Sequence, residues 1–452
     1  MAKIVIIGAG LTGLSAAYHL EQQGFYDYKL FEKENVIGGL CKSVYQDGFT
    51  FDFTGHLLHI SDPYFQGLIK QIVGVENLNK IIRKSFIYSH EVYTPYPYQI
   101  NLHGLPIEVI TDCIQGFVTI AKSRKKPKKY YQWVLQNFGT GFWKHFFFPY
   151  QRKLFDYDAR KLSASWTSRF VPKTSLKQII EGAIKPNNTS QVGYNASFFY
   201  PKQGGIFYWV NKLAKQLKNK IHTNFYVKTV DLKNKLIIFE NGDFERFDTL
   251  ISTIPLDILL KSIKEKPHIQ LKQAAKKLLC NSVVNFNLGV FKQDISDKHW
   301  IYFPQKNVPF YRLGFYHNFS TAMAPKGCSC VYGEFSHVKK SKKFVSAKLK
   351  SSLKSAKDLL RISDTDILTE KIINIPHAYV IYDFWREKNI KSIHKRLHEN
   401  KIHSIGRYGE WKYSSMQEAI LDGKNMADKL MLHAPKTDLL AQKQTRRKNY
   451  NL

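Results

Sequence analysis

The chain has 452 residues, of which 44% are hydrophobic and 14% aromatic, and its formal net charge is +32. This length exceeds what one hydrophobic core usually serves, so the sequence predicts about two or three domains. No stretch approaches the roughly eighteen uninterrupted apolar residues of a membrane-spanning helix, which predicts no membrane insertion. Lysines are spread along the chain, which disfavours nucleic acid as a partner despite the charge. Only Lys122–Lys129 and Lys443–Lys448 form short basic runs.

The amino terminus lacks the features of a secretory signal. Met1 is followed almost at once by the apolar run Lys3–Ile7, without a basic region, a long apolar segment or a cleavage site. We therefore expect a cytoplasmic protein. The five cysteines have neither metal-ligand spacing nor an even disulfide framework, so we expect reduced thiols and no metal site. A basic tail is expected over residues 436–452.

The first predicted elements are a strand, a tight turn and a helix. The β-branched run Lys3–Ile7 precedes Gly8-Ala9-Gly10-Leu11-Thr12-Gly13, after which apolar residues continue at helical spacing. Gly8 allows the turn, Gly10 lets a pyrophosphate approach the backbone, and Gly13 permits close packing of helix on strand. The helix amino terminus then faces the phosphates. The alternative, a glycine turn without a ligand, fits this setting less well.

A second strand and a second glycine pair point to FAD. The strand Tyr28–Phe31 ends in Glu32, where an acid can bind ribose hydroxyls. Gly38-Gly39-Leu40 follows, at a place where a nicotinamide enzyme normally shows no such pair. The two motifs together resemble the opening of the amine-oxidase-like FAD superfamily. In that superfamily's pattern a hairpin after Val227 and a strand over Asp248–Pro255 return the chain to the flavin domain.

A third motif lies near the carboxyl end. Ser404–Gly409, which contains Arg407, is followed by Trp411, Tyr413 and a predicted helix from about Ser415 to Leu430. An arginine there can neutralise the flavin pyrophosphate. The helix would direct its positive end at the flavin ring and stabilise the negative charge of the reduced form. The alternative, in which Arg407 only caps or pairs on the surface, stays open.

Four segments in the middle of the chain resemble UDP-galactopyranose mutases: Thr94–Asn101, Phe148–Phe155, Trp166 with Arg169, and Pro309–Arg312. The resemblance spans most of residues 1–435. It implies an isomerase in which reduced FAD, through N5, is the nucleophile at the anomeric carbon of a nucleotide-linked sugar. The reaction interconverts pyranose and furanose forms of UDP-galactopyranose or a related sugar such as dTDP-fucopyranose. The resemblance also implies an external reductant, such as NAD(P)H or a reductase, and furanose biosynthesis for cell-surface polysaccharide.

The resemblance assigns roles to individual residues. Arg169 and Arg312 match the family's two diphosphate-binding arginines, a task that suits the planar guanidinium fork. His56 matches a histidine beside the flavin, and these three are the expected catalytic residues. The arginines are expected to bind substrate together with Tyr96, Gln99, Tyr150, Gln151, Phe155, Trp166, Tyr311, Tyr379 and Tyr413. The expected cofactor-binding residues are Gly8, Gly10, Leu11, Thr12, Gly13, Glu32, Gly39, Leu40, His56, Val227, Arg407 and Met416.

The sequence departs from the family pattern at several positions. Gln151 and Phe155 stand where the eukaryotic-type mutases usually carry Asn and Trp, and Thr54 replaces the family's usual second glycine. Ser414–Ile420 resembles a branch of nucleotide-sugar mutase homologues often labelled protoporphyrinogen-oxidase-like. An FAD-dependent oxidase or desaturase of the same superfamily is the main alternative, although an apolar substrate gives paired arginines no partner. A binding protein that uses its basic surface on nucleic acid is the other.

The expected fold is α/β, with a Rossmann-type FAD domain, a helical insertion and an antiparallel β-sheet substrate region. The flavin domain would be discontinuous, from residues 1–90, 200–275 and 385–435. The helical insertion would span 91–199 and the sheet 276–384. Alternating apolar and polar residues predict the strands Ser282–Phe291, Trp300–Phe303, Tyr311–Tyr316 and Cys330–Ser336.

Overall fold

The structure, a computed structural model, describes residues 3–120, 126–167, 171–186, 196–264 and 269–432. The first strand lies in the middle of a five-stranded parallel sheet. All its residues are buried, as β-branched side chains are in a sheet covered on both faces. The strand order is β19 (Ile402–Ser404), β13 (Thr249–Ser252), β1 (Ile4–Ile7), β2 (Tyr28–Phe31) and β9 (Ile221–His222). This parallel sheet is the core of the expected flavin-binding fold.

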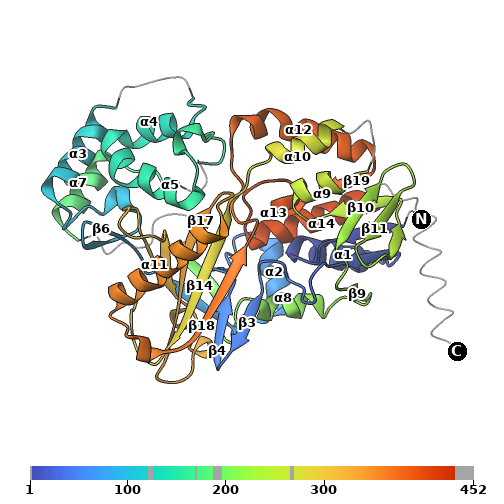
Figure 1. Cartoon of the computed structure of the whole chain (residues 1–452), viewed down its shortest axis with the longest axis horizontal. Helices are drawn as coiled ribbons and strands as arrows, with labels where there is room; N and C mark the ends of the chain where they lie inside the picture. The colour runs from blue at the N-terminus through green and yellow to red at the C-terminus, as the bar shows by residue number, and fades with distance from the viewer. Residues whose placement is uncertain (1–2, 121–125, 168–170, 187–195, 265–268, 433–452) are drawn as a thin grey trace.

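Helices from distant parts of the sequence cover this sheet. Helix α1 (Leu11–Gln22) follows the glycine turn and packs along α14 (Met416–Leu432) at the right of Figure 1. The backbones approach so closely that a Cβ added at Gly423 would lie 2.5 Å from the Thr12 carbonyl oxygen. This part also contains α2 (Pro63–Ile72), α8 (Phe207–Ala214), α9 (Leu256–Ser262), α10 (Ile269–Lys277) and α12 (Phe384–Glu399).

Three small antiparallel sheets connect these elements. The hairpin expected after Val227 is present, with Val227 as the first residue of its first strand. The strands are β10 (Val227–Asp231), β11 (Leu236–Phe239) and β12 (Phe244–Arg246), then β3 (Ser43–Gln46) with β4 (Phe49–Asp52), and β5 (Leu78–Ile82) with β8 (Ser197–Pro201).

A second large sheet has seven strands and is antiparallel except where β15 pairs with β6. The hairpin β6–β7 extends this sheet, so the domain boundary expected at residue 90 falls inside a hairpin. One sheet face packs against the long helix α11 (Lys342–Leu360). The strand order is β18 (Ile367–Ile375), β14 (Ser282–Val290), β17 (Ser329–His337), β16 (Arg312–Phe315), β15 (Trp300–Tyr302), β6 (Ser85–Ser89) and β7 (Val92–Pro95).

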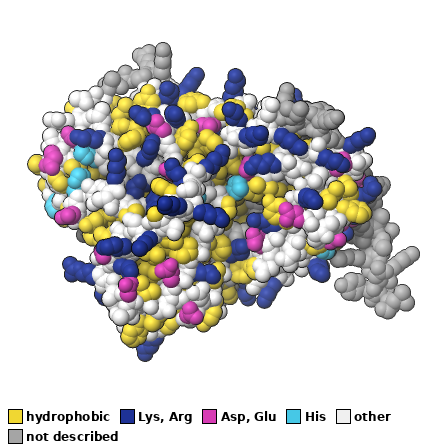
Figure 2. Space-filling model, viewed as in Figure 1, with side chains coloured by type: hydrophobic (Ala, Val, Ile, Leu, Met, Phe, Trp, Pro, Cys, Tyr) yellow, Lys and Arg dark blue, Asp and Glu magenta, His cyan; other side chains and the backbone are white. Residues whose placement is uncertain are grey.

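The molecular surface carries the chain's charge in a dispersed form. Figure 2 shows lysine and arginine side chains scattered over the whole visible face and interleaved with acidic and apolar groups. No basic stripe of the kind that binds nucleic acid stands out on this face. Within the described ranges, no helix is both long and apolar enough to cross a bilayer.

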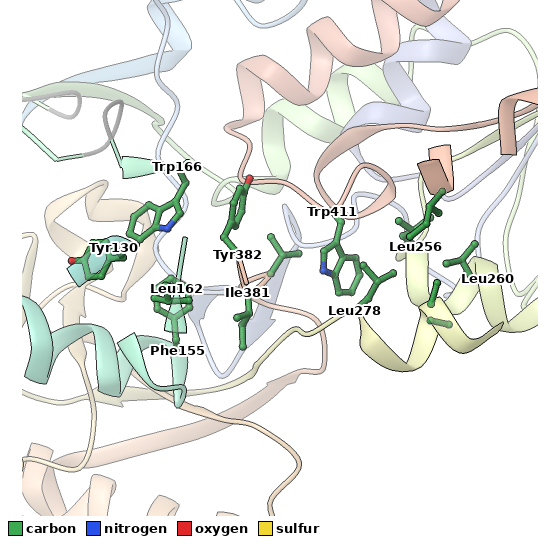
Figure 3. Close-up of a cluster of buried hydrophobic side chains, with 14 of the residues drawn as sticks. Tyr130, Phe155, Leu162, Trp166, Leu256, Leu260, Leu278, Ile381, Tyr382 and Trp411 are labelled. Carbon is green, nitrogen blue, oxygen red and sulfur yellow. The ribbon is translucent and has the colours of Figure 1, made fainter. Parts of the chain in front are cut away.

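A helical part lies at the upper left of Figure 1 and shares a core with the flavin-binding part. Figure 3 shows this core running from Tyr130 and Phe155 through Ile381 to Trp411 and Leu260. The continuous core holds the helices against the segment that connects β18 to α12. These helices are α3 (Ile107–Val118), α4 (Tyr130–Phe142), α5 (Phe148–Phe155) and α7 (Leu176–Ile184).

Candidate active site

The glycine turn between β1 and α1 has the geometry that the sequence predicts. Gly8 has a φ of +96° and donates its N–H to the Phe31 carbonyl oxygen at 2.7 Å. A Cβ at Gly13 would collide with the Gly8 carbonyl oxygen, so only glycine permits this packing. Helix α1 has no side-chain cap at Gly10 and no acidic residue in its first turn. Its first amides can therefore bind an anion.

Glu32 and the second glycine pair support the same turn. Glu32 is buried, and its carboxylate accepts hydrogen bonds from the Ala9 N–H at 2.8 Å and the Glu34 N–H at 3.0 Å. Gly38 donates its N–H to the Ala9 carbonyl oxygen at 2.8 Å, which places Gly39 beside Gly10. The carboxylate thus holds together the two glycine turns, Gly8–Gly13 and Gly38–Gly39, which we call the glycine cradle. Its remaining lone pairs are available to a ribose. Leu40 follows in the same turn.

Arg407 is a partly buried residue of α13 (Gly406–Gly409). It donates hydrogen bonds to the carbonyl oxygens of Ser414 at 2.8 Å and Ala378 at 3.3 Å. Its centre lies 5.8 Å from the rings of Tyr379 and Tyr413. Among the described residues it makes no carboxylate contact, and its Nε has no hydrogen-bond partner. The side chain thus hydrogen-bonds to backbone carbonyls and does not pair with an acid of the described part, so no carboxylate there offsets its charge.

His56 lies close enough to Arg407 and Arg312 for their positive charges to act on it. Burial, with the positive charges of Arg407 and Arg312, lowers the pKa of His56 to about 4. Its Nδ1 is buried without a hydrogen-bond partner among the described residues. The imidazole is therefore neutral near pH 7. Thr54, which replaces the expected glycine, keeps a left-handed φ of +73°, a strained conformation for a β-branched residue.

Asp52 is a buried polar centre that the sequence analysis missed. It accepts hydrogen bonds from Ser43 Oγ at 2.6 Å, Tyr200 Oη at 2.6 Å and the Ile206 N–H at 3.1 Å. Burial raises its pKa to about 6. These bonds hold the Gly204-Gly205 turn, whose two residues both have positive φ. Its only sequence signal is an acid at the end of an otherwise uncharged strand.

Arg312 is held on the inner face of the large sheet by a second acid that the sequence analysis missed. Its Nε and Nη2 donate to the two carboxylate oxygens of Glu334 at 2.9 and 2.8 Å, and Tyr311 Oη donates to the same carboxylate. Glu334 is fully buried. The bidentate pair orients the guanidinium and offsets much of its charge, which leaves Nη1 for a ligand.

Aromatic rings surround these two arginines. The ring centre of Tyr150 lies 5.4 Å from that of Tyr302 and 6.4 Å from that of Tyr311. Burial raises the pKa of Tyr150, Tyr311 and Tyr413 well above the usual value, so the phenols stay neutral and can donate hydrogen bonds. We call the group the aromatic cage; its members are Tyr150, Phe155, Trp166, Tyr302, Tyr311, Tyr379 and Tyr413.

The remaining expected residues lie around this cage. Tyr96 packs against Tyr302 at 5.5 Å, and Gln151 is buried in α5 beside the cage residues of that helix. Gln99 instead donates its amide to the Pro172 carbonyl oxygen at 2.7 Å. Arg169 lies outside the described residues.

Taken together, the uncapped helix, the paired glycine turns and the partly buried Arg407 fit a dinucleotide cofactor. Two residues expected to bind the cofactor lie at the start of secondary-structure elements. Val227 begins β10, and Met416 begins α14 and is buried. The fold and the cradle define a flavin-type dinucleotide-binding protein.

Residues 11–321 match the family described as flavin containing amine oxidoreductase, and the chain belongs to this family of FAD-binding enzymes. Its fold is that of a reduced UDP-galactopyranose mutase crystal structure, with a TM-score of 0.89 and 25% identity over 99% of this chain and 97% of the other. A putative protoporphyrinogen oxidase from Exiguobacterium sp. 255-15 shares the fold, with a TM-score of 0.72 and 14% identity over 95% of this chain and 99% of that chain. The expected superfamily and the likeness to the mutases are confirmed.

The names of the sequence relatives indicate a different chemistry. A 4,4'-diapolycopene oxygenase from Methylomonas sp is 24% identical over 329 residues, which cover 64% of this chain and 63% of the oxygenase. A 4,4'-diapophytoene desaturase from Staphylococcus aureus is 44% identical over 62 residues, which cover 14% of this chain and 12% of the desaturase. The matches thus span less than two thirds of either relative.

Proposed function

We propose that this protein is a flavin-dependent nucleotide-sugar mutase that interconverts pyranose and furanose forms of UDP-galactopyranose or a related sugar such as dTDP-fucopyranose. The observation that carries the proposal is the likeness to a UDP-galactopyranose mutase along nearly the whole chain, at a TM-score of 0.89. The flavin domain of residues 1–90, 200–275 and 385–435 would bind the cofactor. The parts 91–199 and 276–384 would bind the substrate. We further propose a cytoplasmic location and an external reductant such as NAD(P)H.

The charges of the site suit a substrate with a diphosphate. Arg312, oriented by Glu334, would present Nη1 to a phosphate oxygen, and Arg169 would complete the clamp. Tyr379 and Tyr413 would donate phenolic hydrogen bonds without adding charge. A guanidinium among neutral aromatic rings interacts strongly with an anion because the local dielectric is low.

The cofactor would be held by the glycine cradle and Arg407. When bound and reduced, FAD supplies a nucleophile for the anomeric carbon. The chain's own contribution is to hold the sugar against that group and to exclude water. The neutral His56 would lie beside the flavin without adding a charge, and the Gly204-Gly205 turn would let the substrate approach.

The second candidate is an FAD-dependent oxidase or desaturase. It is favoured by the similarity to 4,4'-diapolycopene oxygenase. An apolar substrate would, however, leave the partly buried Arg407 and the Arg312–Glu334 pair facing hydrocarbon, which is energetically costly.

The test uses the FAD-loaded protein reduced with dithionite and a panel of UDP- and dTDP-pyranoses, with products separated by chromatography. A new isomer of equal mass, formed by reduced but not by oxidised protein, is the expected result. Arg312→Lys keeps the charge but loses the fork and should lower kcat/KM at least tenfold. The matched control is Arg160→Lys at an exposed position. If no isomer forms and an apolar polyene bleaches the oxidised flavin, the protein is an oxidase or desaturase.

A further inference from the structure

Asn281 is a buried residue just before β14 that contacts two parts of the proposed site at once. Its side-chain carbonyl accepts a hydrogen bond from the Tyr379 N–H at 2.8 Å. Its side-chain amide donates to the Leu154 carbonyl oxygen at 2.7 Å. One short side chain therefore connects the segment that carries Tyr379 to the last turn of α5.

Backbone hydrogen bonds fix Asn281 itself against the Tyr379 segment. The Asn281 N–H donates to the Tyr379 carbonyl oxygen, and its own carbonyl accepts from the Ala378 N–H, both at 3.0 Å. The Ala378 carbonyl oxygen in turn accepts from Arg407 and from Tyr408 Oη. The orientation of the Arg407 guanidinium is thus coupled to the backbone that Asn281 holds.

On its other side, Asn281 holds the end of α5. The Leu154 carbonyl oxygen accepts a second hydrogen bond, from Ser336 Oγ of β17, at 2.6 Å. Phe155, the next residue, lies 6.2 Å from Tyr379 and 6.3 Å from Tyr413, ring to ring. Among the residues that the structure describes, Asn281 is the side chain that hydrogen-bonds to both Leu154 and Tyr379, because the Ser336 bond connects Leu154 to β17.

We propose that Asn281 is a positioning residue that sets the spacing between Phe155 and Tyr379 and thereby the affinity for the nucleotide diphosphate. The inference rests on the proposed function for the identity of the ligand. The amide suits this task because it offers one acceptor and one donor in a fixed geometry. Water does not compete for either group, since Asn281 has no exposed surface.

The experiment compares Asn281→Asp with Ser336→Ala in the FAD-loaded protein. Aspartate keeps the acceptor for Tyr379 but turns an oxygen toward the Leu154 carbonyl, which repels it and widens the gap. Ser336→Ala removes a hydrogen bond from the same carbonyl without touching the Tyr379 segment. FAD content and thermal stability are recorded first, and UDP binding is then measured by calorimetry.

We expect Asn281→Asp to retain FAD and to bind UDP about tenfold more weakly, whereas Ser336→Ala stays within about twofold of wild type. Asn281→Ser, which is shorter and loses the bridge without adding charge, is the second variant and should behave as Asn281→Asp does. UDP affinity unchanged in both Asn281 variants would overturn the proposal. Loss of FAD or of the fold in both would also overturn it, because Asn281 would then support the whole structure.

Hydrogen exchange separates this proposal from the proposed function. If wild type itself does not bind UDP, the nucleotide-sugar function fails. Peptides covering residues 148–155 and 378–382 should still exchange faster in Asn281→Asp than in Ser336→Ala. Equal exchange in the two variants would contradict the spacing role whatever the ligand.

Discussion

Asp52→Asn should change how the stability of the protein depends on pH. Burial raises the Asp52 pKa from 3.8 to about 6. As pH rises through this interval the unfolded chain loses its proton first, so the folded state binds more protons and stability falls with pH. The difference between these two pKa values corresponds to about 3 kcal/mol of folding stability, which is lost by neutral pH. Asparagine has the same shape and does not titrate.

The assay is thermal unfolding of the FAD-loaded wild type and variant from pH 4 to 7. For a chain of 452 residues, about 3 kcal/mol corresponds to roughly 3 °C in Tm. The difference Tm(variant) minus Tm(wild type) should therefore rise by about 3 °C across the range. Taking this difference removes the contribution of His56, which is the same in both proteins. Its pKa is lowered to about 4, so His56 makes both proteins more stable as pH rises.

The matched control is Asp27→Asn at an exposed position, which makes the same substitution away from the buried site. A flat difference for Asp52→Asn would refute the reasoning. Asp52 would then be ionised at all these pH values, held by its three hydrogen-bond donors rather than neutralised by burial. A difference that falls with pH would show that the donors dominate outright.

Other variants test the cradle, the strain and the arginines. Gly13→Ala should lower FAD affinity more than tenfold, seen as lost flavin absorbance after gel filtration, because its Cβ meets the Gly8 carbonyl oxygen. Thr54→Gly should raise the free energy of unfolding by about 1 kcal/mol, because glycine adopts a positive φ without strain; denaturant titration measures it. A lower free energy of unfolding would show that the threonine side chain stabilises the fold by more than the strain destabilises it. Glu334→Ala should cost about 3–5 kcal/mol because it leaves Arg312 buried without its partner, whereas Glu334→Gln should cost less. Arg407→Gln should weaken FAD at least tenfold, and unchanged flavin retention would contradict its assignment.

Much of the flavin side could be predicted from the sequence. The glycine turn, the acid that ends β2 and the long helix after Arg407 are local patterns, because φ angles, close approach and helical spacing act within a few residues. Four strands of the large sheet, β14 to β17, were predicted within a residue or two for the same reason, whereas β6, β7 and β18 were not predicted. The expected domain boundary at residue 90 falls inside the hairpin β6–β7, because the residues of this hairpin give no sign of which sheet edge it joins.

Tertiary structure alone decided the chemistry of the buried polar groups. The acceptor of the Tyr200 hydroxyl is Asp52, 148 residues away, and the partner of Asn281 is Leu154, 127 residues away. Glu334 meets Arg312 only because β16 and β17 pair in one register, which sets the two side chains opposite each other. Whether an acid is neutral, ion-paired or hydrogen-bonded to the backbone depends on its burial and on donors brought from elsewhere in the chain. Residue type and spacing determine the local backbone, but desolvation and long-range pairing exist only in the folded molecule.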